Sequence, residues 1–415
     1  MWDVLKNKFL KIADKHAPSK VRKVKSVYTP WFSKDIRKQV NHRDYLNKKA
    51  IQTNSPAYHC AFKRAKNNVN KIIKTAKSNY HQRNENNPKV MWKEINQLIG
   101  KKSKTTCISL LKLDDNTVVT DDENIAHTLN NYFVGVGPNL SSLLPNSNAK
   151  VSDYVVKGNK SFNFTEISYD KVYSMLLNIK KSKSPGSDKI TAKLVTDAAD
   201  VIAPFLTNIF NQSTSLGVFS DEWKEAVVTP IFKSDDPQYC GNYHPISVLS
   251  IIAKIFESLI SQQLFEFLDN NENLTKYQSG FRKGHSTMTP LLNSTNQWLL
   301  NTDKGLINGI PFLDVRKAFD TIDHTIFLEK LQLYGINGIE LQWFTSYLRN
   351  RVQCCKINQT VSNKQILKCG VPQGSNLGPL LFLLYVHALP NCLNHSIPQM
   401  FAGKVTRRYP NKIEW

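Results

Sequence analysis

The sequence has few of the features that mark secreted or membrane proteins. Its seven cysteines are odd in number and form no Cys-x-x-Cys pair, which argues against a disulfide framework and gives no zinc signature. The longest apolar run, Leu380–Val386, is too short to cross a bilayer. The first residues also lack the charged and apolar regions of a signal peptide. We therefore expect a protein of the nucleus or the cytoplasm, neither secreted nor held in a membrane.

A glycine-rich phosphate loop, of the kind found in P-loop or dinucleotide-binding folds, is also missing. A phosphate site in this chain must therefore rest on carboxylates, metal ions and basic side chains. Acidic residues are scarce, with 33 Asp+Glu against 55 Lys+Arg in 415 residues. The imbalance is concentrated near the start of the chain, because residues 1–104 carry 26 basic and 6 acidic side chains, a net charge of +20.

Residues 1–137 are predicted to form a basic helical region. Between Phe62 and Tyr80 apolar residues recur at a spacing of three and four, among lysines and asparagines. Such a surface favours polyanions through counterion release, so nucleic acid is the leading partner; a simply solvated helical face is the alternative, and a membrane surface fits less well. The candidate nucleic-acid-binding residues are Lys63, Arg64, Lys66, Lys71, Lys74 and Lys77.

The middle of the chain contains the best candidate linker. The segment Thr120-Asp121-Asp122-Glu123 offers an N-cap with early acidic residues and predicts a helix that ends near Phe133, with Gly135 and Gly137 as stop signals. Residues 138–163 are rich in Ser, Asn, Pro and Gly and are predicted to be a linker. Helix and strand patterns alternate from residue 164 onward, which predicts an α+β fold.

One segment of this α+β part ends in a candidate functional carboxylate. Leu306–Asp314 is apolar and bounded by glycine, which predicts a buried strand with Asp314 at its C-terminal end, opening onto a cleft. A helix is predicted to follow over Thr321–Tyr334. Asp320 and Asp323 lie at the start of this helix, where carboxylates favour the helix dipole, so both are expected to cap it.

Four short motifs follow one another in the α+β part. They are Asn242-Tyr243-His244-Pro245-Ile246-Ser247, Gln278-Ser279-Gly280-Phe281-Arg282, Leu313-Asp314 through Phe319-Asp320, and Gly370-Val371-Pro372-Gln373-Gly374-Ser375. Their order and spacing resemble the reverse transcriptases of non-LTR (LINE-type, jockey-like) retrotransposons. This resemblance implies right-hand polymerase fingers and a partial palm over residues 164–402. The basic helices before them look like the segment that joins endonuclease to polymerase in such elements.

The resemblance also implies ligands and residue roles. The expected partners are an RNA template, a DNA primer and deoxynucleotides, with Mg²⁺ as cofactor and Asp314 as the residue that binds both metal ions. Phe319 would crowd the 2′ position of the nucleotide sugar, although the sequence fits a Phe319 that packs in the hydrophobic core equally well. Gln373, with Gly374, would contact the incoming nucleotide, and Arg282 would approach the triphosphate unless it is a plain surface cation.

Two positions depart from the family's pattern. His244 stands where arginine is usual, and a mostly neutral imidazole does not replace a fixed positive charge. At Phe401-Ala402-Gly403-Lys404 the family has an aromatic residue, Ala and two Asp, so Gly403 and Lys404 occupy the positions of the carboxylates that would complete the metal site. Residues 403–415 resemble nothing in the family and are expected to be an aberrant tail, with the palm hairpin and the thumb lost.

These observations predict the reverse transcriptase domain of a non-LTR retrotransposon, an RNA-directed DNA polymerase whose catalysis is impaired. Two divalent ions need carboxylates from more than one segment, because each hard cation takes several oxygen ligands. The alternative is a nucleic-acid-binding remnant without catalysis, or a host protein adapted from such an element. The sequence identifies no protein partner.

Overall fold

A computed structural model of the chain divides it into two compact units. Unit 1 comprises Met1–Ala17 and Thr106–Trp415, and unit 2 comprises Pro18–Thr105. The structure describes residues 1–18, 29–83, 87–99, 108–113, 115–145, 147–271, 274–393 and 396–412. Within these ranges no helix is both long and apolar enough to span a bilayer.

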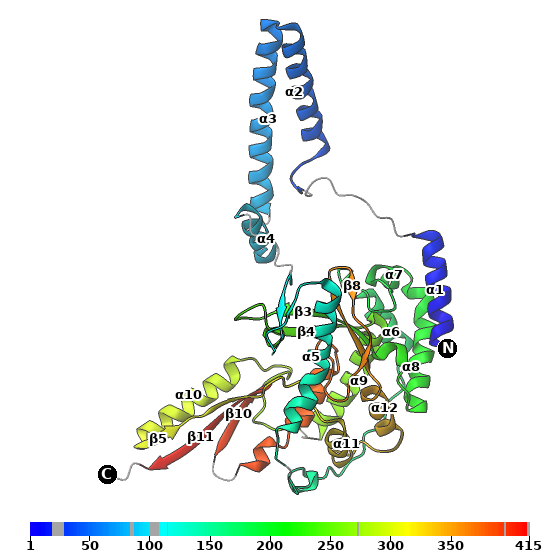
Figure 1. Cartoon of the computed structure of the whole chain (residues 1–415), viewed down its shortest axis with the longest axis vertical. Coiled ribbons are helices and arrows are strands. Elements are labelled where there is room, and N and C mark those ends of the chain that lie inside the picture. Colours follow the sequence, from blue (N-terminus) through cyan, green and yellow to red (C-terminus); the bar gives the residue numbers. More distant parts are fainter. Residues whose placement is uncertain are drawn as a thin grey trace. The chain divides into compact units, whose positions relative to one another are not determined.

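Unit 2 is a helical hairpin with a third, shorter helix. Helices α2 (Lys34–Thr53) and α3 (Pro56–Arg83) lie side by side, and α4 (Pro88–Leu98) follows (Figure 1). The Ser33 hydroxyl accepts a hydrogen bond from the backbone N–H of Ile36 and so caps α2. Few side chains of this pair are buried, because two helices alone can cover only one narrow stripe of each other.

Unit 1 begins with helix α1 (Trp2–His16), which is fastened to the body of that unit. The Trp2 ring meets the Trp223 ring edge-on at 5.2 Å, and Trp2 Nε1 donates a hydrogen bond to Glu222 over 2.7 Å. Lys6 forms an ion pair with the same carboxylate. Helix α1 and the described residues between 108 and 137 belong to unit 1 in this division, and the domain boundary expected at residue 137 stays a prediction.

Helix α5 (Asp122–Ser142) starts where it was predicted and ends later. The expected N-cap lies in this segment, where Asp121 accepts a hydrogen bond from the backbone N–H of Asn124. The predicted end near Phe133 is wrong, since the helix continues through both glycines. A Cβ at Gly137 would lie 2.2 Å from the Cys369 sulfur and 2.4 Å from the Asp320 carbonyl oxygen, so this glycine allows close packing rather than ending the helix.

The segment predicted to be a linker is attached to unit 1 along much of its length. Its first residues complete α5, and η1 (Val151–Asp153) follows. Further on, the backbone N–H of Gly158 donates to the Leu333 carbonyl over 2.7 Å, and that of Phe162 donates to the Gly335 carbonyl over 2.9 Å. The Phe162 side chain is buried. A composition typical of linkers does not reveal such backbone contacts with a distant helix end.

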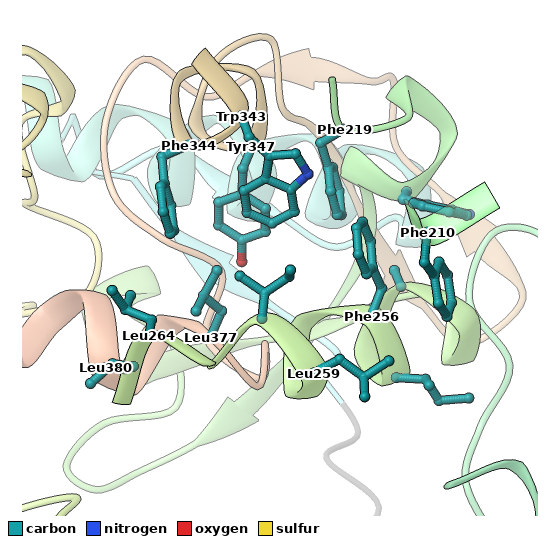
Figure 2. Close-up of a cluster of buried hydrophobic side chains, with 14 of the residues drawn as sticks. Phe210, Phe219, Phe256, Leu259, Leu264, Trp343, Phe344, Tyr347, Leu377 and Leu380 are labelled. Atoms are coloured by element: carbon teal, nitrogen blue, oxygen red, sulfur yellow. The ribbon is translucent and has the colours of Figure 1, made fainter. Parts of the chain in front are cut away.

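The main core of unit 1 lies among helices that surround α9 (Ile251–Asn270). Its other helices are α6 (Tyr169–Leu177), α7 (Ala192–Asp197), α8 (Ala199–Leu216), α11 (His324–Leu333), α12 (Gly338–Leu348) and α13 (Gly378–Val386), with the short turns η2 (Asp221–Lys224), η3 (Cys240–Asn242) and η4 (Leu389–Cys392) between elements. Figure 2 shows rings from α8, α9 and α12 gathered in one cluster. Phe256 stacks on Phe210 with 4.5 Å between ring centroids.

Replacing this central ring tests how far the core depends on it. Phe256→Ala is expected to lower the free energy of unfolding of unit 1 by about 3–5 kcal/mol, because the lost ring leaves a cavity among aromatic neighbours. The matched control is Phe205→Ala on α8, where the ring is 56% exposed and the expected change is within about 0.5 kcal/mol. Urea denaturation followed by tryptophan fluorescence measures both. Equal losses in the two variants would contradict this account of the core.

In the described residues of unit 1 the strands form two larger sheets and one small hairpin. One sheet has the order β4–β3–β7–β8, with β9 also pairing with β7; its strands are β3 (Glu225–Phe232), β4 (Tyr243–Val248), β7 (Val352–Ile357), β8 (Thr360–Val361) and β9 (Gln365–Ile366). The other has the order β10–β11–β5, with β6 pairing with β11; its strands are β5 (Leu306–Gly309), β6 (Phe312–Asp314), β10 (Ile397–Phe401) and β11 (Lys404–Lys412). Strands β1 (Leu111–Lys112) and β2 (Val118–Val119) form the hairpin. The expected α+β class is confirmed.

The second sheet corrects two expectations. The buried strand predicted over Leu306–Asp314 is two short strands, interrupted at Pro311, which has no N–H for a ladder hydrogen bond. Helix α10 (Met288–Asp303) packs along β5 and β10 (Figure 1), yet β6 is exposed, with Phe312 at 74%. The expected loss of the hairpin after Phe401 is also wrong, because β10 and β11 pair antiparallel from Phe401–Lys404 to Ile397–Arg408.

Candidate active site

The hairpin between β10 and β11 lies directly against Asp314. In the ladder between β6 and β11, Asp314 is opposite Lys404, and the backbone N–H of Val315 donates to the Gly403 carbonyl over 2.9 Å. Residues directly opposite each other in an antiparallel pair share one face of the sheet, with Cβ atoms about 5 Å apart. The position where the resemblance implies a second carboxylate therefore adjoins Asp314 in space, and its neighbour Lys404 adds a positive charge there.

Gly403 has room for a side chain near the residues that follow Asp314. Its φ lies outside the left-handed region, so other residues can adopt its backbone conformation. A Cβ built on Gly403 would lie 3.3 Å from the Ala318 Cβ and 3.7 Å from the Val315 Cβ, which requires a small adjustment. A side chain at this position would thus stand next to the residues that follow Asp314.

The Gln-Ser-Gly motif holds the turn of this hairpin. Buried Gln278 accepts a hydrogen bond from the Ala402 N–H through its Oε1 atom, at 3.0 Å, and donates to the Ala402 carbonyl through Nε2, at 3.2 Å. A Cβ at Gly280 would lie 2.1 Å from the Ala402 nitrogen, so only glycine permits this approach. The motif was recognised in the sequence, but no role for Gln278 could be predicted, because its partner Ala402 lies 124 residues away.

The Pro-Gln-Gly motif meets two other motifs. Gln373 Nε2 donates hydrogen bonds to both carboxylate oxygens of Asp320, at 3.0 and 2.8 Å, and the Gln373 carbonyl accepts one from the Ser247 N–H at 2.8 Å. Gly374 has a φ of 120°, and a Cβ there would lie 2.8 Å from the Ser247 carbonyl oxygen. The expected nucleotide contacts of Gln373 and Gly374 stay predictions; what the structure shows is a Gln373 amide held by Asp320.

Of the two aspartates expected to cap α11, only one does so. Asp323 accepts a hydrogen bond from the Ile326 N–H over 2.9 Å and is the N-cap, which confirms its predicted role. The capping role predicted for Asp320 is wrong, because its carboxylate points to Gln373 instead. Burial raises the pKa of Asp320 to about 6, an effect that the Gln373 hydrogen bonds and the nearby Lys317 ammonium reduce in part.

The raised pKa of Asp320 predicts in which direction the stability of the folded chain changes with pH. The native pKa of about 6 exceeds the ordinary 3.8, so the buried charge lowers stability progressively as pH rises from about 4 to about 6, by up to about 3 kcal/mol. Asp320→Asn removes this titration. The stability of the Asn variant relative to the unaltered chain should therefore rise between about pH 4 and about pH 6 and level off above pH 6. Any loss of the Gln373 hydrogen bonds adds an offset that does not vary with pH. Urea denaturation at pH 4, 5, 6 and 7 measures the difference, and a flat difference would contradict the buried charge.

Phe319 and Arg282 lie in different surroundings. The Phe319 ring is half-buried and packs 5.1 Å from the Phe382 ring and 6.1 Å from the Phe281 ring, which is the packing expected of a core aromatic. The Arg282 guanidinium donates to the Thr275 carbonyl over 3.1 Å and lines a cavity that includes none of Asp314, Phe319 and Gln373. The roles that the resemblance implies for Phe319 and Arg282 at a nucleotide stay predictions.

His244 lies on β4 near two cations. Burial, together with Lys317 and Lys233, lowers the pKa of its imidazole, so this side chain is neutral at physiological pH. Position 244 therefore carries no positive charge in the folded protein, in line with the departure noted from the sequence.

The residues around Asp314 do not fit a pair of magnesium ions. Among the residues that the structure describes, no group of three or more His, Cys, Asp or Glu side chains is placed to hold a metal ion. Lys404 stands opposite Asp314, and the carboxylate of Asp320 is buried and bonded to Gln373. Divalent cations of this kind require several oxygen ligands. The described side chains around Asp314 therefore supply too few oxygen ligands for a two-ion site.

The candidate nucleic-acid-binding residues lie together on another element. All six are exposed side chains of α3 in unit 2, whereas Asp314 belongs to unit 1. The Lys77 ammonium lies 4.8 Å from the centroid of the Trp31 ring, a cation–π contact. The six residues are Lys63, Arg64, Lys66, Lys71, Lys74 and Lys77.

Comparisons with known proteins agree with the arrangement of the motifs. Residues 231–409 match the family described as "Reverse transcriptase (RNA-dependent DNA polymerase)", a span that includes the β10–β11 turn. The chain is 30% identical over 252 residues to the "Probable RNA-directed DNA polymerase from transposon X-element" of Drosophila melanogaster, covering 59% of this chain and 27% of that protein. It is 29% identical over 237 residues to the "RNA-directed DNA polymerase from mobile element jockey" of the same species, covering 55% and 25%. The chain thus spans about a quarter of the length of these relatives.

Proposed function

We propose, from the membership of this chain in the reverse transcriptases of the non-LTR retrotransposon type, that unit 1 is a fingers-and-palm polymerase domain whose catalysis is impaired. The reaction for which such a domain is built is the extension of a DNA primer along an RNA template with deoxynucleotides. The whole relatives are much longer, so this proposal concerns the domain alone.

The observation that carries the proposal is the pairing of Asp314 with Lys404. The β10–β11 hairpin pairs with β6, and at the positions where the resemblance implies two carboxylates it carries Gly403 and Lys404, with Lys404 opposite Asp314 in the ladder. An ammonium in this place repels divalent ions and supplies no oxygen ligand. Losing several kcal/mol of transition-state stabilisation lowers the rate by roughly a thousandfold or more, at about 1.4 kcal/mol per tenfold.

Primer extension tests the proposal directly. We expect the unaltered chain, with an RNA template, a DNA primer, deoxynucleotides and either Mg²⁺ or Mn²⁺, to extend the primer no faster than Asp314→Ala does. If the unaltered chain extends the primer and Asp314→Ala does not, the proposal that catalysis is impaired is refuted. A template–primer binding assay on the same samples separates a lack of chemistry from a lack of binding.

A second candidate function is nucleic-acid binding without catalysis. The supporting observation is the row of exposed basic side chains on α3, in a region of net charge +20. Counterion release would make such binding steeply dependent on salt and largely independent of sequence. This candidate does not exclude the first, because a domain without chemistry can still hold a template and primer. Nucleic-acid binding without catalysis would fit a remnant of a retrotransposon as well as a host protein adapted from a retrotransposon.

A further inference from the structure

A cavity of about 780 Å³ lies in unit 1 apart from Asp314. Its walls are formed by the segment around Gly158, the C-terminal end of α9, residues between 274 and 285, and the ends of α11 and α13. Phe281 and Arg282 are adjacent in the chain but diverge, since the Phe281 ring packs toward Phe319 while Arg282 lines the cavity.

The charged residues of the wall are mostly cations. Lys157, Lys276 and Arg282 line the cavity, and Asp269 is the acidic residue among the described lining. Within the described part of the chain, neither Lys157 nor Lys276 is joined to a carboxylate by an ion pair. Like charges gathered around a hollow repel one another, so an anion that enters it is stabilised.

Neutral donors add to these charges. The Thr275 N–H donates to Nδ1 of His387 over 3.1 Å, so the neutral imidazole carries its proton on Nε2. Burial, with Lys330 and Arg282 nearby, lowers the pKa of His387 to about 4 and keeps it in that neutral form. The hydrogen bond from Arg282 Nη1 to the Thr275 carbonyl holds the guanidinium at the wall. Guanidinium, ammonium and N–H donors together are the groups that recognise phosphate oxygens.

We propose that this cavity is a phosphate-binding site, occupied by the phosphate groups of a nucleotide or of a nucleic-acid strand without the help of a divalent ion. Both sources present the same oxygens, and competition distinguishes them. The site is independent of the chemistry at Asp314, so it does not depend on whether the domain polymerises.

Titration calorimetry of the full chain with pyrophosphate, in the presence of EDTA, tests the proposal. Lys157→Ala with Lys276→Ala should weaken binding by about tenfold, because two ammonium groups are lost. Asp269→Asn should strengthen it by about threefold, because the acidic residue of the wall is neutralised. The control is Lys193→Ala on α7, an exposed lysine outside the cavity, which should leave the affinity unchanged. All of these side chains are exposed, so the fold should tolerate each change.

Competition then identifies the source of the phosphate. If dATP displaces pyrophosphate and a single-stranded oligonucleotide does not, the site is assigned to nucleotides. If the oligonucleotide displaces pyrophosphate, and this competition is lost in the Lys157→Ala, Lys276→Ala variant, the site is assigned to a nucleic-acid strand. Displacement by neither would leave a site for small inorganic anions only and would overturn the proposal. Undetectable pyrophosphate binding, or equal binding by all variants, would overturn it as well.

Discussion

Gly403→Asp combined with Lys404→Asp is expected to raise primer extension on an RNA template by roughly a thousandfold over the unaltered chain. The double change replaces a cation with two carboxylates on a hairpin that already lies against Asp314. The backbone at Gly403 accepts another residue, and the contact with Ala318 requires a shift of only a few tenths of an ångström. The gain should require Mg²⁺ or Mn²⁺.

Two controls make this result interpretable. Asp314→Ala in the double variant should return extension to the level of the unaltered chain, because the shared ligand is then lost. Lys404→Ala alone removes the cation without adding a ligand and should give much less than the double change. Fast extension by the unaltered chain, or extension by the double variant that persists without Asp314, would contradict the account of the site. Binding of template–primer by each variant should be measured in parallel.

Neutralising the basic face of α3 is expected to remove most of the salt dependence of RNA binding. Replacing Lys63, Arg64, Lys66, Lys71, Lys74 and Lys77 by Gln should reduce the slope of log affinity against log salt by up to about 4, at about 0.7 per phosphate contact on a single strand. At low salt the affinity should fall by on the order of a hundredfold or more. Both quantities can be measured by filter binding to a single-stranded RNA between about 50 and about 300 mM KCl. This range includes the span of about 50 to 200 mM salt over which counterion release changes affinity strongly.

The matched control keeps the charge and changes the side chains. Replacing the five lysines of this set by Arg should preserve the slope, because counterion release depends on charge. Gln and Arg both favour helices, so circular dichroism should show α3 intact in either variant. If the unaltered chain binds RNA with little salt dependence, or the Gln variant binds as the unaltered chain does, the assignment of α3 to nucleic acid fails.

Local signals predicted several features of this fold. A cap was expected within Thr120-Asp121-Asp122-Glu123 and at Asp323, and Asp121 and Asp323 do cap their helices, because a cap depends on the three or four residues that follow it. The structure then shows that the motifs singled out in the sequence contact one another or the β10–β11 turn. Gln278 and Gly280 contact Ala402, and Gln373 and Gly374 contact Asp320 and Ser247.

Other features depend on neighbours that no local pattern reveals. Gly137 looked like a stop signal, yet it lies within α5 because the Asp320 backbone and Cys369 pack against it. The same reasoning applies to Asp320, whose position suggested a cap but whose partner is Gln373, 53 residues away. The apolar segment ending at Asp314 looked like a buried strand, but burial depends on what covers it, and β6 is exposed.

The amino-acid sequence alone determined which chemistry this protein resembles and which carboxylates it lacks, since both are matters of residue identity and order along the chain. It also determined where the positive charge is concentrated. Only the tertiary structure decided that the hairpin carrying Gly403 and Lys404 forms and lies against Asp314, that Asp320 holds Gln373, and that Arg282 faces a separate cationic cavity. These outcomes depend on backbone pairing and packing between segments tens to hundreds of residues apart.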